Sequence, residues 1–295
     1  MPTILVTGLN PAWQKALEFQ EFRPGQVNRA SSCYEFGSGK GLNVSMVLRR
    51  LGHEVSLLQV VGGINGERLE AYCRQRDIEP LSIRVRNETR VCTTLIDQSS
   101  GQVTEVIEPF SVSADEQVLQ RILHSLDSRS QYDALVMSGT APAGLEPQVY
   151  LEIARRVKAP LVVLDVVQEI SPELLAMAGL LKVNADEYAR LEKRGLSHPT
   201  TLVTDGPRPA RLLQCRGNEL SQTCLHLPEL QGVRNPIGAG DTVTAYLTHE
   251  LLAGKNVVEA SRQALAAGMA SCLSILPGDF EETTRQALAA GIVVN

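Results

Sequence analysis

The second half of the chain alternates short apolar runs with segments of helical periodicity, and this alternation restricts the fold more than any other feature. The apolar runs span residues 133–138, 160–165, 180–184 and 201–204. Residues 146–158, between the first two runs, place Val149, Ile153 and Val157 at helical spacing. Apolar strands separated by helices are typical of a parallel sheet covered on both faces. The sequence therefore predicts an α/β fold with a mostly parallel sheet. Four further helices are predicted: one begins at Ser171-Pro172, one begins at Ala185, and two cover about 240–253 and 257–276.

Two regions of the first half, 10–36 and 83–110, are polar and rich in β-branched residues. They predict a small secondary sheet attached to the main one, with lid strands from about 11–36 and 83–110, inside a single domain of residues 1–295. Ligands of open α/β sheets bind at the carboxyl ends of the strands, where such a lid would exclude water. Exposed strand edges invite pairing with another chain, so a homodimer through the lid is left open.

The bulk composition excludes several classes of partner. The formal net charge of −5 argues against nucleic acid, while 43% hydrophobic and 21% charged residues are those of an ordinary globular protein. No apolar run approaches the roughly 18 residues of a membrane span. The start, MPTILVTGLNP, lacks the basic and long apolar regions of a signal peptide. We therefore expect a cytoplasmic protein without a membrane partner.

The cysteines are scattered without any C-x-x-C pair. Their positions are Cys33, Cys73, Cys92, Cys215, Cys224 and Cys272. This spacing suits neither a zinc site nor a disulfide framework, so reduced, mostly buried thiols are expected.

Residues 36–45, FGSGKGLNVS, have the composition of a loop that holds a phosphate. The P-loop pattern fails because Gly41 follows Gly39-Lys40 where a Ser or Thr is required, and because Tyr34 stands where the first glycine should be. The dinucleotide pattern G-x-G-x-x-G fails because its last glycine, Gly41, comes one residue early. The loop is therefore neither of the standard nucleotide loops.

Residues 235–254 carry the stretch most suited to chemistry. Gly238-Ala239-Gly240 precedes an apolar helical run, so backbone amides at a helix N-terminus can face an anion. Asp241, at the mouth of the same turn, can accept a proton from a hydroxyl while the amides stabilise a phosphoryl group in transfer. The alternative is an ordinary helix cap with Asp241 in the first turn.

Seven motifs occur in order along the chain: Leu9-Asn10-Pro11-Ala12, Gly25-Gln26-Val27-Asn28-Arg29, Gly39-Lys40-Gly41-Leu42-Asn43-Val44, Thr89-Arg90, Ser138-Gly139-Thr140-Ala141-Pro142-Ala143-Gly144, Lys182-Val183-Asn184-Ala185-Asp186-Glu187 and Asn235-Pro236-Ile237-Gly238-Ala239-Gly240-Asp241. Through them the chain resembles the ribokinase-like (PfkB) carbohydrate kinases, and within these the branch of 1-phosphofructokinases and tagatose-6-phosphate kinases. The resemblance implies a three-layer α/β/α fold, ATP and Mg²⁺ as cofactors, and Asp241 as the catalytic base beside the Gly238-Ala239-Gly240 turn.

The resemblance also assigns the loop around Lys40 to the acceptor sugar. Gly39 and Gly41 would let the backbone approach the sugar, Lys40 would meet its negative charge, and Asn43 would bond its hydroxyls; Ser138 is placed with the acceptor as well. The alternative is a glycine-rich turn before a helix, with Lys40 solvated.

A phosphate on the acceptor is inferred from Arg29 and Arg90. The guanidinium fork suits phosphate, and two arginines converging with Lys40 would neutralise a dianion. The alternative is that each is a surface arginine on a lid strand. The Val-Asn-Arg and Thr-Arg contexts resemble the phosphosugar branch and favour the phosphate.

The nucleotide side is assigned by resemblance to Asn184 and Glu187, which would position Mg²⁺ through water. The alternative is an Asn N-cap followed by an acidic residue in the first turn. Thr204 and Gly206 resemble the strand end and loop that contact ATP, although the usual second glycine of that loop is replaced around Pro207-Arg208-Pro209.

Two departures from the family pattern leave the acceptor open. Gln14 stands where the phosphofructokinase branch usually has an Asp that binds sugar hydroxyls, and Ser38 stands where the loop usually has its first glycine. The leading hypothesis is an ATP-dependent kinase of a phosphorylated ketohexose, of the fructose 1-phosphate or tagatose 6-phosphate type. One alternative is a kinase of an unphosphorylated sugar or nucleoside; another is a noncatalytic sugar-phosphate-binding protein.

Overall fold

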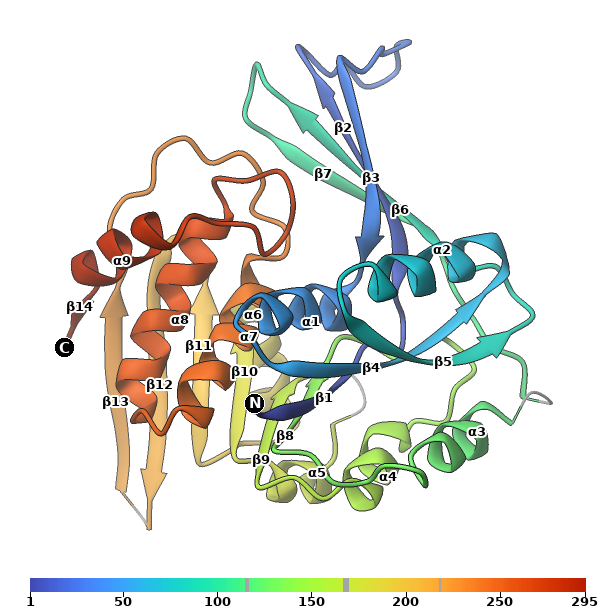
Figure 1. Cartoon of the computed structure of the whole chain (residues 1–295). Helices are drawn as coiled ribbons and strands as arrows, with labels where there is room; N and C mark the ends of the chain where they lie inside the picture. Colours follow the sequence, from blue (N-terminus) through green and yellow to red (C-terminus); the bar gives the residue numbers. More distant parts are fainter. Residues whose placement is uncertain (115–116, 167–169, 218) are drawn as a thin grey trace.

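The computed structural model describes residues 1–114, 117–166, 170–217 and 219–295, and within them the strands form one large and one small sheet (Figure 1). The large sheet has the order β14 (Val293–Val294), β13 (Glu219–His226), β12 (Arg208–Arg216), β11 (Thr200–Asp205), β10 (Leu180–Asn184), β9 (Leu161–Asp165), β8 (Ala134–Ser138), β1 (Thr3–Thr7), β4 (Glu54–Gly62) and β5 (Ile78–Val85).

The strands from β11 to β5 are all parallel, and β12, β13 and β14 extend this sheet with antiparallel pairings. The parallel strands β1, β8, β9 and β10 are buried almost from end to end because helices cover both of their faces. The mostly parallel sheet expected from the apolar runs is therefore confirmed.

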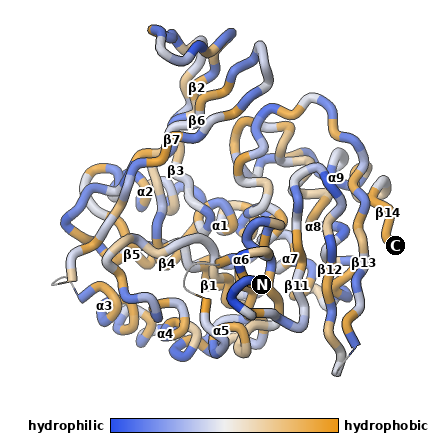
Figure 2. Tube along the Cα trace, turned by 180° about the vertical axis from the view of Figure 1, so that it is seen from behind, coloured by the Kyte–Doolittle hydropathy of each residue, from blue (hydrophilic) through white to orange (hydrophobic). Residues whose placement is uncertain are grey.

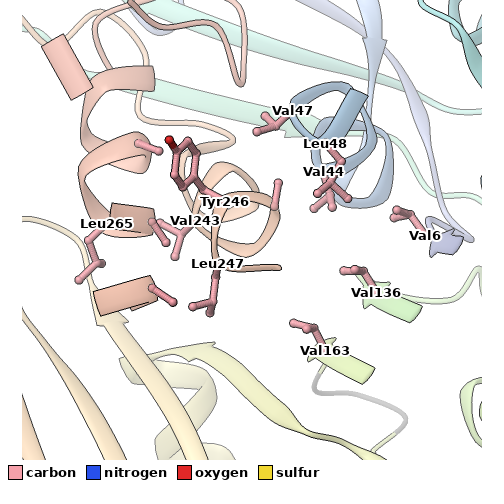
Figure 3. Packing of buried hydrophobic residues seen from close by; sticks show 14 of the residues in the cluster. Val6, Val44, Val47, Leu48, Val136, Val163, Val243, Tyr246, Leu247 and Leu265 are labelled. Atoms are coloured by element: carbon pink, nitrogen blue, oxygen red, sulfur yellow. The ribbon is translucent and has the colours of Figure 1, made fainter. Parts of the chain in front are cut away.

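The helices are α1 (Lys40–Arg50), α2 (Gly63–Arg74), α3 (Val118–Ser125), α4 (Val149–Arg156), α5 (Pro172–Met177), α6 (Ala185–Lys193), α7 (Ala239–Leu252), α8 (Val257–Ser271) and α9 (Glu282–Gly291). One apolar core joins α1, α2, α7, α8 and α9 to the sheet, and a second core joins α3, α4, α5 and α6 to it. Figure 3 shows part of the first core, to which α1, α7 and β8 contribute Val44, Leu247 and Val136. Hydrophilic and hydrophobic residues are mixed along the helices that cover the sheet (Figure 2), as expected for amphipathic elements.

The helix that begins at Ser171-Pro172 starts as predicted, since the Ser171 hydroxyl accepts a hydrogen bond from the backbone amide of Leu174. The helix expected over 257–276 ends earlier, at Ser271. The Cys272 carbonyl accepts hydrogen bonds from the backbone amides of Arg234 and Asn235, which take the place of a further helical turn. Leu276 precedes Pro277, which also disfavours a helical conformation there.

The small sheet has the order β3 (Ser32–Ser38), β2 (Ala12–Phe19), β6 (Val91–Asp97) and β7 (Val103–Ile107), and it projects from one end of the main body (Figure 1). The expected secondary sheet is present, but its second boundary is wrong. Residues 83–85 belong to β5 of the large sheet instead, because they continue the parallel pairing of β5 with β4 up to Val85.

The cysteines are free thiols in the described chain, but the expectation that most are buried is wrong. Only Cys73 and Cys92 are buried, whereas Cys33 and Cys215 are exposed. Cys33 is exposed because β3 alternates its burial at that end and turns Cys33 outward. Across the described ranges, no helix combines the length and the apolar character needed to cross a membrane.

Candidate active site

A cavity of about 360 Å³ lies at the carboxyl ends of the central parallel strands. Its lining is Gly8, Asn10, Pro11, Gly39, Lys40, Gly41, Arg90, Glu105, Ile107, Ser138, Gly139, Thr140, Asp165, Val166, Glu187 and Arg190. A larger and more open hollow, of about 760 Å³, lies at the opposite ends of the strands, beside Thr3 and Asp133. We identify the smaller cavity as the site because ligands of open α/β sheets bind at the carboxyl ends, and because a buried charged cluster lies there.

The centre of this cluster is Asp165, the last residue of β9, which is 1% exposed. Its Oδ1 lies 3.0 Å from the Lys40 Nζ and 3.5 Å from the Lys182 Nζ. Its Oδ2 accepts hydrogen bonds from the Thr244 hydroxyl at 3.0 Å and from the Ser138 hydroxyl at 3.3 Å. Four elements far apart in sequence are therefore joined by one carboxylate.

The charges of the cluster hold one another in the ionised state. Burial alone would raise the pKa of Asp165, but Lys182 and Lys40 outweigh it, and the pKa is lowered. Burial likewise disfavours the Lys40 ammonium, but the neighbouring Asp165 and Asp241 raise its pKa. Asp165 is therefore a carboxylate and Lys40 an ammonium near neutral pH.

Asp241 is the second buried acid, 5% exposed, in the first turn of α7, and it is not among the residues that line the cavity. Its Oδ2 accepts a hydrogen bond of 2.8 Å from the Asn43 amide of α1. Burial raises its pKa to about 6, with Asp165 adding to the rise and Lys40 and Asn43 opposing it. A carboxyl with such a pKa can serve as a base near neutral pH.

Asp241 lies in the first turn of α7, as the alternative interpretation expected, but no side chain caps this helix. The N-cap residue is Gly238, whose φ of 83° favours glycine. At Gly240 an added Cβ would lie 2.9 Å from the Lys182 Nζ. The ammonium of Lys182 therefore lies directly against the glycine turn, where it adds positive charge to the helix N-terminus.

The loop predicted to hold the acceptor, Gly39-Lys40-Gly41, lines the cavity. At Gly41 an added Cβ would lie 2.4 Å from the Cα of Gly8. The absence of a side chain at Gly41 is thus required by the protein's own backbone packing, whatever a ligand needs. Ser38 is buried, and its hydroxyl lies 3.5 Å from the Asn43 Oδ1 behind the loop.

The structure does not bring Gln14 to the cavity. Its side chain is 4% exposed, and its amide donates a hydrogen bond of 2.8 Å to the Thr94 hydroxyl inside the small sheet. Gln14 is also absent from the cavity lining.

The two arginines predicted to bind a phosphate lie apart. Arg90 lines the cavity and donates to the backbone carbonyls of Asn10, at 2.8 Å, and Pro11, at 3.3 Å. Arg29 is exposed in the connection between β2 and β3 and does not line the cavity. Figure 1 shows this connection at the projecting end of the small sheet. In the described part of a single chain, Arg29 therefore does not converge with Lys40 as expected.

The residues predicted to contact the nucleotide lie at or just beyond the ends of β10 and β11. The Asn184 Oδ1 accepts from the Glu187 amide, and the Glu187 Oε2 accepts from the Asn184 amide, a complete capping box. The other Glu187 oxygen, Oε1, lies 3.8 Å from the Lys40 Nζ. Thr204 is paired with Asn184 across the sheet, and Gly206 forms the open turn after β11.

The local capping interaction is therefore present, and a metal-positioning role for this pair stays a prediction. Groups of three or more His, Cys, Asp or Glu side chains that could hold a metal are absent from the part of the chain that the structure describes.

Sequence reasoning assigned no role to Asp165, Lys182 or Thr244. Two of them carried a signal: Asp165 ends a buried apolar strand at its carboxyl end, and Lys182 is a charged residue inside another apolar run. A buried lysine requires a partner, which identifies it as part of a charged site. Thr244 carried no such signal, because a threonine on a helix is common.

Comparison with known proteins identifies the family and the fold. The family model for pfkB family carbohydrate kinases matches residues 4–284. A tagatose-6-phosphate kinase of Staphylococcus epidermidis is 27% identical over 310 residues, covering 96% of this chain and 98% of the relative. Phosphofructokinase-2 from Escherichia coli, solved in complex with potassium, is 20% identical with a TM-score of 0.83 and 99% of each chain covered. A ribokinase from Thermotoga maritima, also 20% identical, has a TM-score of 0.76, with 98% of this chain and 100% of that chain covered. The fold is therefore ribokinase-like, as expected.

Proposed function

The chain belongs to the pfkB family of carbohydrate kinases, and on that premise we propose that it transfers the γ-phosphoryl group of ATP to a hydroxyl of a phosphorylated ketohexose. The phosphosugar is favoured by the likeness to a tagatose-6-phosphate kinase over nearly the whole chain. At 27% identity this relative supports a phosphorylated sugar as the class of acceptor.

One observation carries the proposal: Asp241 is a buried carboxyl with a pKa of about 6, at a helix start closed by glycine rather than by a side chain. A general base must lie within hydrogen-bond reach of the acceptor hydroxyl, and its pKa should lie near the working pH. The uncapped amides beside it can stabilise negative charge on the group in transfer.

Each member of the cluster has a distinct role in this mechanism. Asp241 takes the proton of the acceptor hydroxyl, and Asn43 holds the carboxylate in place through its 2.8 Å hydrogen bond. Lys40 and Lys182 supply fixed positive charge, and both lie against the Oδ1 of Asp165. Because these charges are held by the protein before the reaction, no reorganisation is needed during the transfer.

The residues present fit ATP and Mg²⁺. The amides of the Gly238-Ala239-Gly240 turn and the Lys182 ammonium suit the phosphates, and the Glu187 Oε1, which the capping box leaves unused, suits the water shell of a hard cation. ATP supplies the phosphoryl group, and Mg²⁺ neutralises phosphate charge. Asn184, Thr204 and Gly206 complete the nucleotide side of the proposal.

The acceptor's own phosphate is assigned to Arg90, which lines the cavity just before β6 of the small sheet; Arg190 also lines this cavity. Gln14 and Arg29 would have to change position to reach the acceptor, so the small sheet is proposed to close as a lid when the acceptor binds.

ADP release should be measured with the purified protein, Mg²⁺ and ATP across ketose phosphates, free sugars and nucleosides. We expect turnover of fructose 1-phosphate or tagatose 6-phosphate, and a KM for that phosphosugar raised about tenfold or more in Arg90→Ala, because a charge-assisted hydrogen bond is lost. Turnover confined to unphosphorylated acceptors would reject the phosphosugar proposal.

A kinase of an unphosphorylated acceptor is the second candidate. It is favoured by Arg29 lying outside the cavity and by Lys40 being paired with Asp165 already. In that case neither Arg29→Ala nor Arg90→Ala selectively weakens a phosphosugar, and the same panel separates the two candidates.

A further inference from the structure

A second cavity, of about 440 Å³, lies between the C-terminal halves of α1 and α2 and the segment 276–279. We propose that it is a binding site for a small organic oxyanion, a phosphate or carboxylate group on a compact apolar body, held by Arg49, Arg50 and Arg76. Its volume is within the range of roughly 300–1,000 Å³ that small-molecule sites occupy. Its lining shares no residue with the cavity beside Asp165.

The charge of this second cavity is positive. Three arginines line it against two carboxylates, Asp77 and Asp279. These carboxylates pair with Arg49 at 3.5 Å and with Arg50 at 3.0 Å, and their side chains are 78% and 61% exposed. Exposed ion pairs of this kind contribute little stability, so an incoming oxyanion can replace them at small cost.

The guanidinium groups keep donors that the folded chain does not use. The Arg49 Nε is buried from solvent and has no hydrogen-bond partner among the described residues. Arg76 donates one long bond, of 3.5 Å, to the Tyr72 carbonyl. A guanidinium offers five donors in a fork that matches phosphate or carboxylate oxygens. A bound oxyanion would accept hydrogen bonds from the exposed donors of Arg76, whereas the Arg49 Nε is closed to solvent and contributes charge only.

Arginine near a helix C-terminus also complements the helix dipole, and Arg49 and Arg50 occupy the last turn of α1. That role accounts for their position on the helix. The dipole does not explain why the Arg49 Nε is buried without a hydrogen-bond partner. It also does not explain the position of Arg76, whose guanidinium lies over the Tyr72 ring, 3.5 Å from the ring centroid.

The remaining wall is apolar, which is why we infer an organic ligand and not a bare inorganic ion. Phe36, Met46 and Tyr72 line it beside the arginines. The Arg76 guanidinium is already stacked on Tyr72, so a planar group could lie against the same wall.

This second cavity also adjoins the Gly238-Ala239-Gly240 turn that precedes Asp241. Pro277 lines it, and an added Cβ at Gly238 would lie 2.5 Å from the Pro277 Cβ. An added Cβ at Gly278, the next residue, would lie 2.6 Å from Val47 of α1. Segment 276–279 is thus packed against both α1 and the turn that precedes Asp241. A ligand here is expected to change the maximal turnover and leave acceptor binding unblocked.

The chain offers an internal reporter for binding. Trp13 is the only tryptophan, and its ring packs edge-on against Tyr72 at 6.1 Å between centroids. Phenyl phosphate, benzoate and orthophosphate should each be titrated into the full chain at constant ionic strength, with Trp13 emission recorded. We expect a saturable response, with phenyl phosphate or benzoate half-saturating at lower concentration than orthophosphate. Whichever of the two binds more tightly identifies the oxyanion as phosphate or carboxylate.

Matched variants locate the response. Arg76→Ala should raise the half-saturating concentration about tenfold, Arg76→Lys less, and Arg155→Ala, an exposed arginine of α4, not at all. Lys40→Met, which removes a cation from the other cavity, should keep the response. An unchanged midpoint in Arg76→Ala, its loss in Lys40→Met, or a signal that sodium chloride reproduces would each overturn the proposal. The measurement uses no substrate, so it stands or falls separately from the kinase proposal.

Discussion

The starts of α6 and α7 face the same cluster but are built in opposite ways. Helix α6 begins at Asn184, whose side chain closes the helix with Glu187 in a complete capping box. Helix α7 begins at Gly238, which has no side chain to offer, and its first-turn acid, Asp241, bonds Asn43 of another helix instead. In sequence, both starts show an acidic residue in the first helical turn.

The difference shows how a helix N-terminus is kept available for a ligand. A side-chain cap satisfies amides of the first turn from within, as Asn184 does. Glycine offers these amides no side chain, and in α7 the Ala239 amide bonds the Pro236 carbonyl at 3.3 Å instead. The acid of the first turn is directed into the protein, where burial raises its pKa to about 6. We therefore regard α7 as the reactive start and α6 as the structural one, and the following changes test that distinction.

The largest expected effect is that of Asp241→Asn. Without the base, kcat should fall roughly 10²–10⁴-fold, measured as ADP release with the preferred acceptor. Asp186→Asn, at the exposed first turn of α6, is the matched control and should retain near-normal turnover. Turnover near the native level in Asp241→Asn would reject the assignment of the base.

Asp241→Asn should also stabilise the fold as pH rises. The pKa of Asp241 is about 6 in the folded protein and 3.8 in its ordinary state. The neutral carboxyl therefore contributes its full stability below pH 3.8, and this stability is lost as the pH rises through about 6. The variant should gain on the order of 3 kcal/mol relative to the native protein between about pH 4 and pH 7, measured by denaturant unfolding. A pH-independent difference would contradict the raised pKa.

An intermediate effect is expected for Lys40→Met on the pH profile. In the native protein, kcat/KM should rise with pH through about 6 as Asp241 loses its proton. Lys40 lowers the pKa of Asp241, so its removal should move this limb to higher pH. Lys158→Met, an exposed lysine at the opposite ends of the strands, should leave the limb in place. A limb that does not move in Lys40→Met would show that another group titrates.

The smallest effect is expected for the cap of α6. Asn184→Ala and Asn256→Ala each remove an asparagine that caps a helix through the amide three residues on, so each should cost about 1 kcal/mol of unfolding free energy. Only Asn184→Ala should also raise the Mg²⁺ concentration needed for half-maximal activity, because Asn256 lies at the start of α8. Equal Mg²⁺ requirements in both variants would leave Asn184 with a purely structural role.

Much of the fold could be predicted because its signals are local. Apolar runs that end at Ser138, Asp165 and Asn184 predict strands, and their alternation with helical segments predicts a parallel sheet. Boundaries were less predictable: residues 83–85 resemble the polar region that follows them, yet they pair with β4. The pairing of β5 with β4 decides that boundary, and a local sequence pattern does not predict such pairing.

The candidate site divides in the same way. The sequence by itself determined the chemical groups and the turns that hold them, including Asp241 beside its glycines and the loop around Lys40. Only the tertiary structure decided which groups meet: Asp165 with Lys40 and Lys182, Gln14 inside the small sheet, and Arg29 away from the cavity. The physical reason is that helix and strand propensities act over a few residues, whereas packing brings buried charges together across the sheet. An unpaired buried charge costs roughly several kcal/mol of folding free energy, so arrangements that pair the charges are selected.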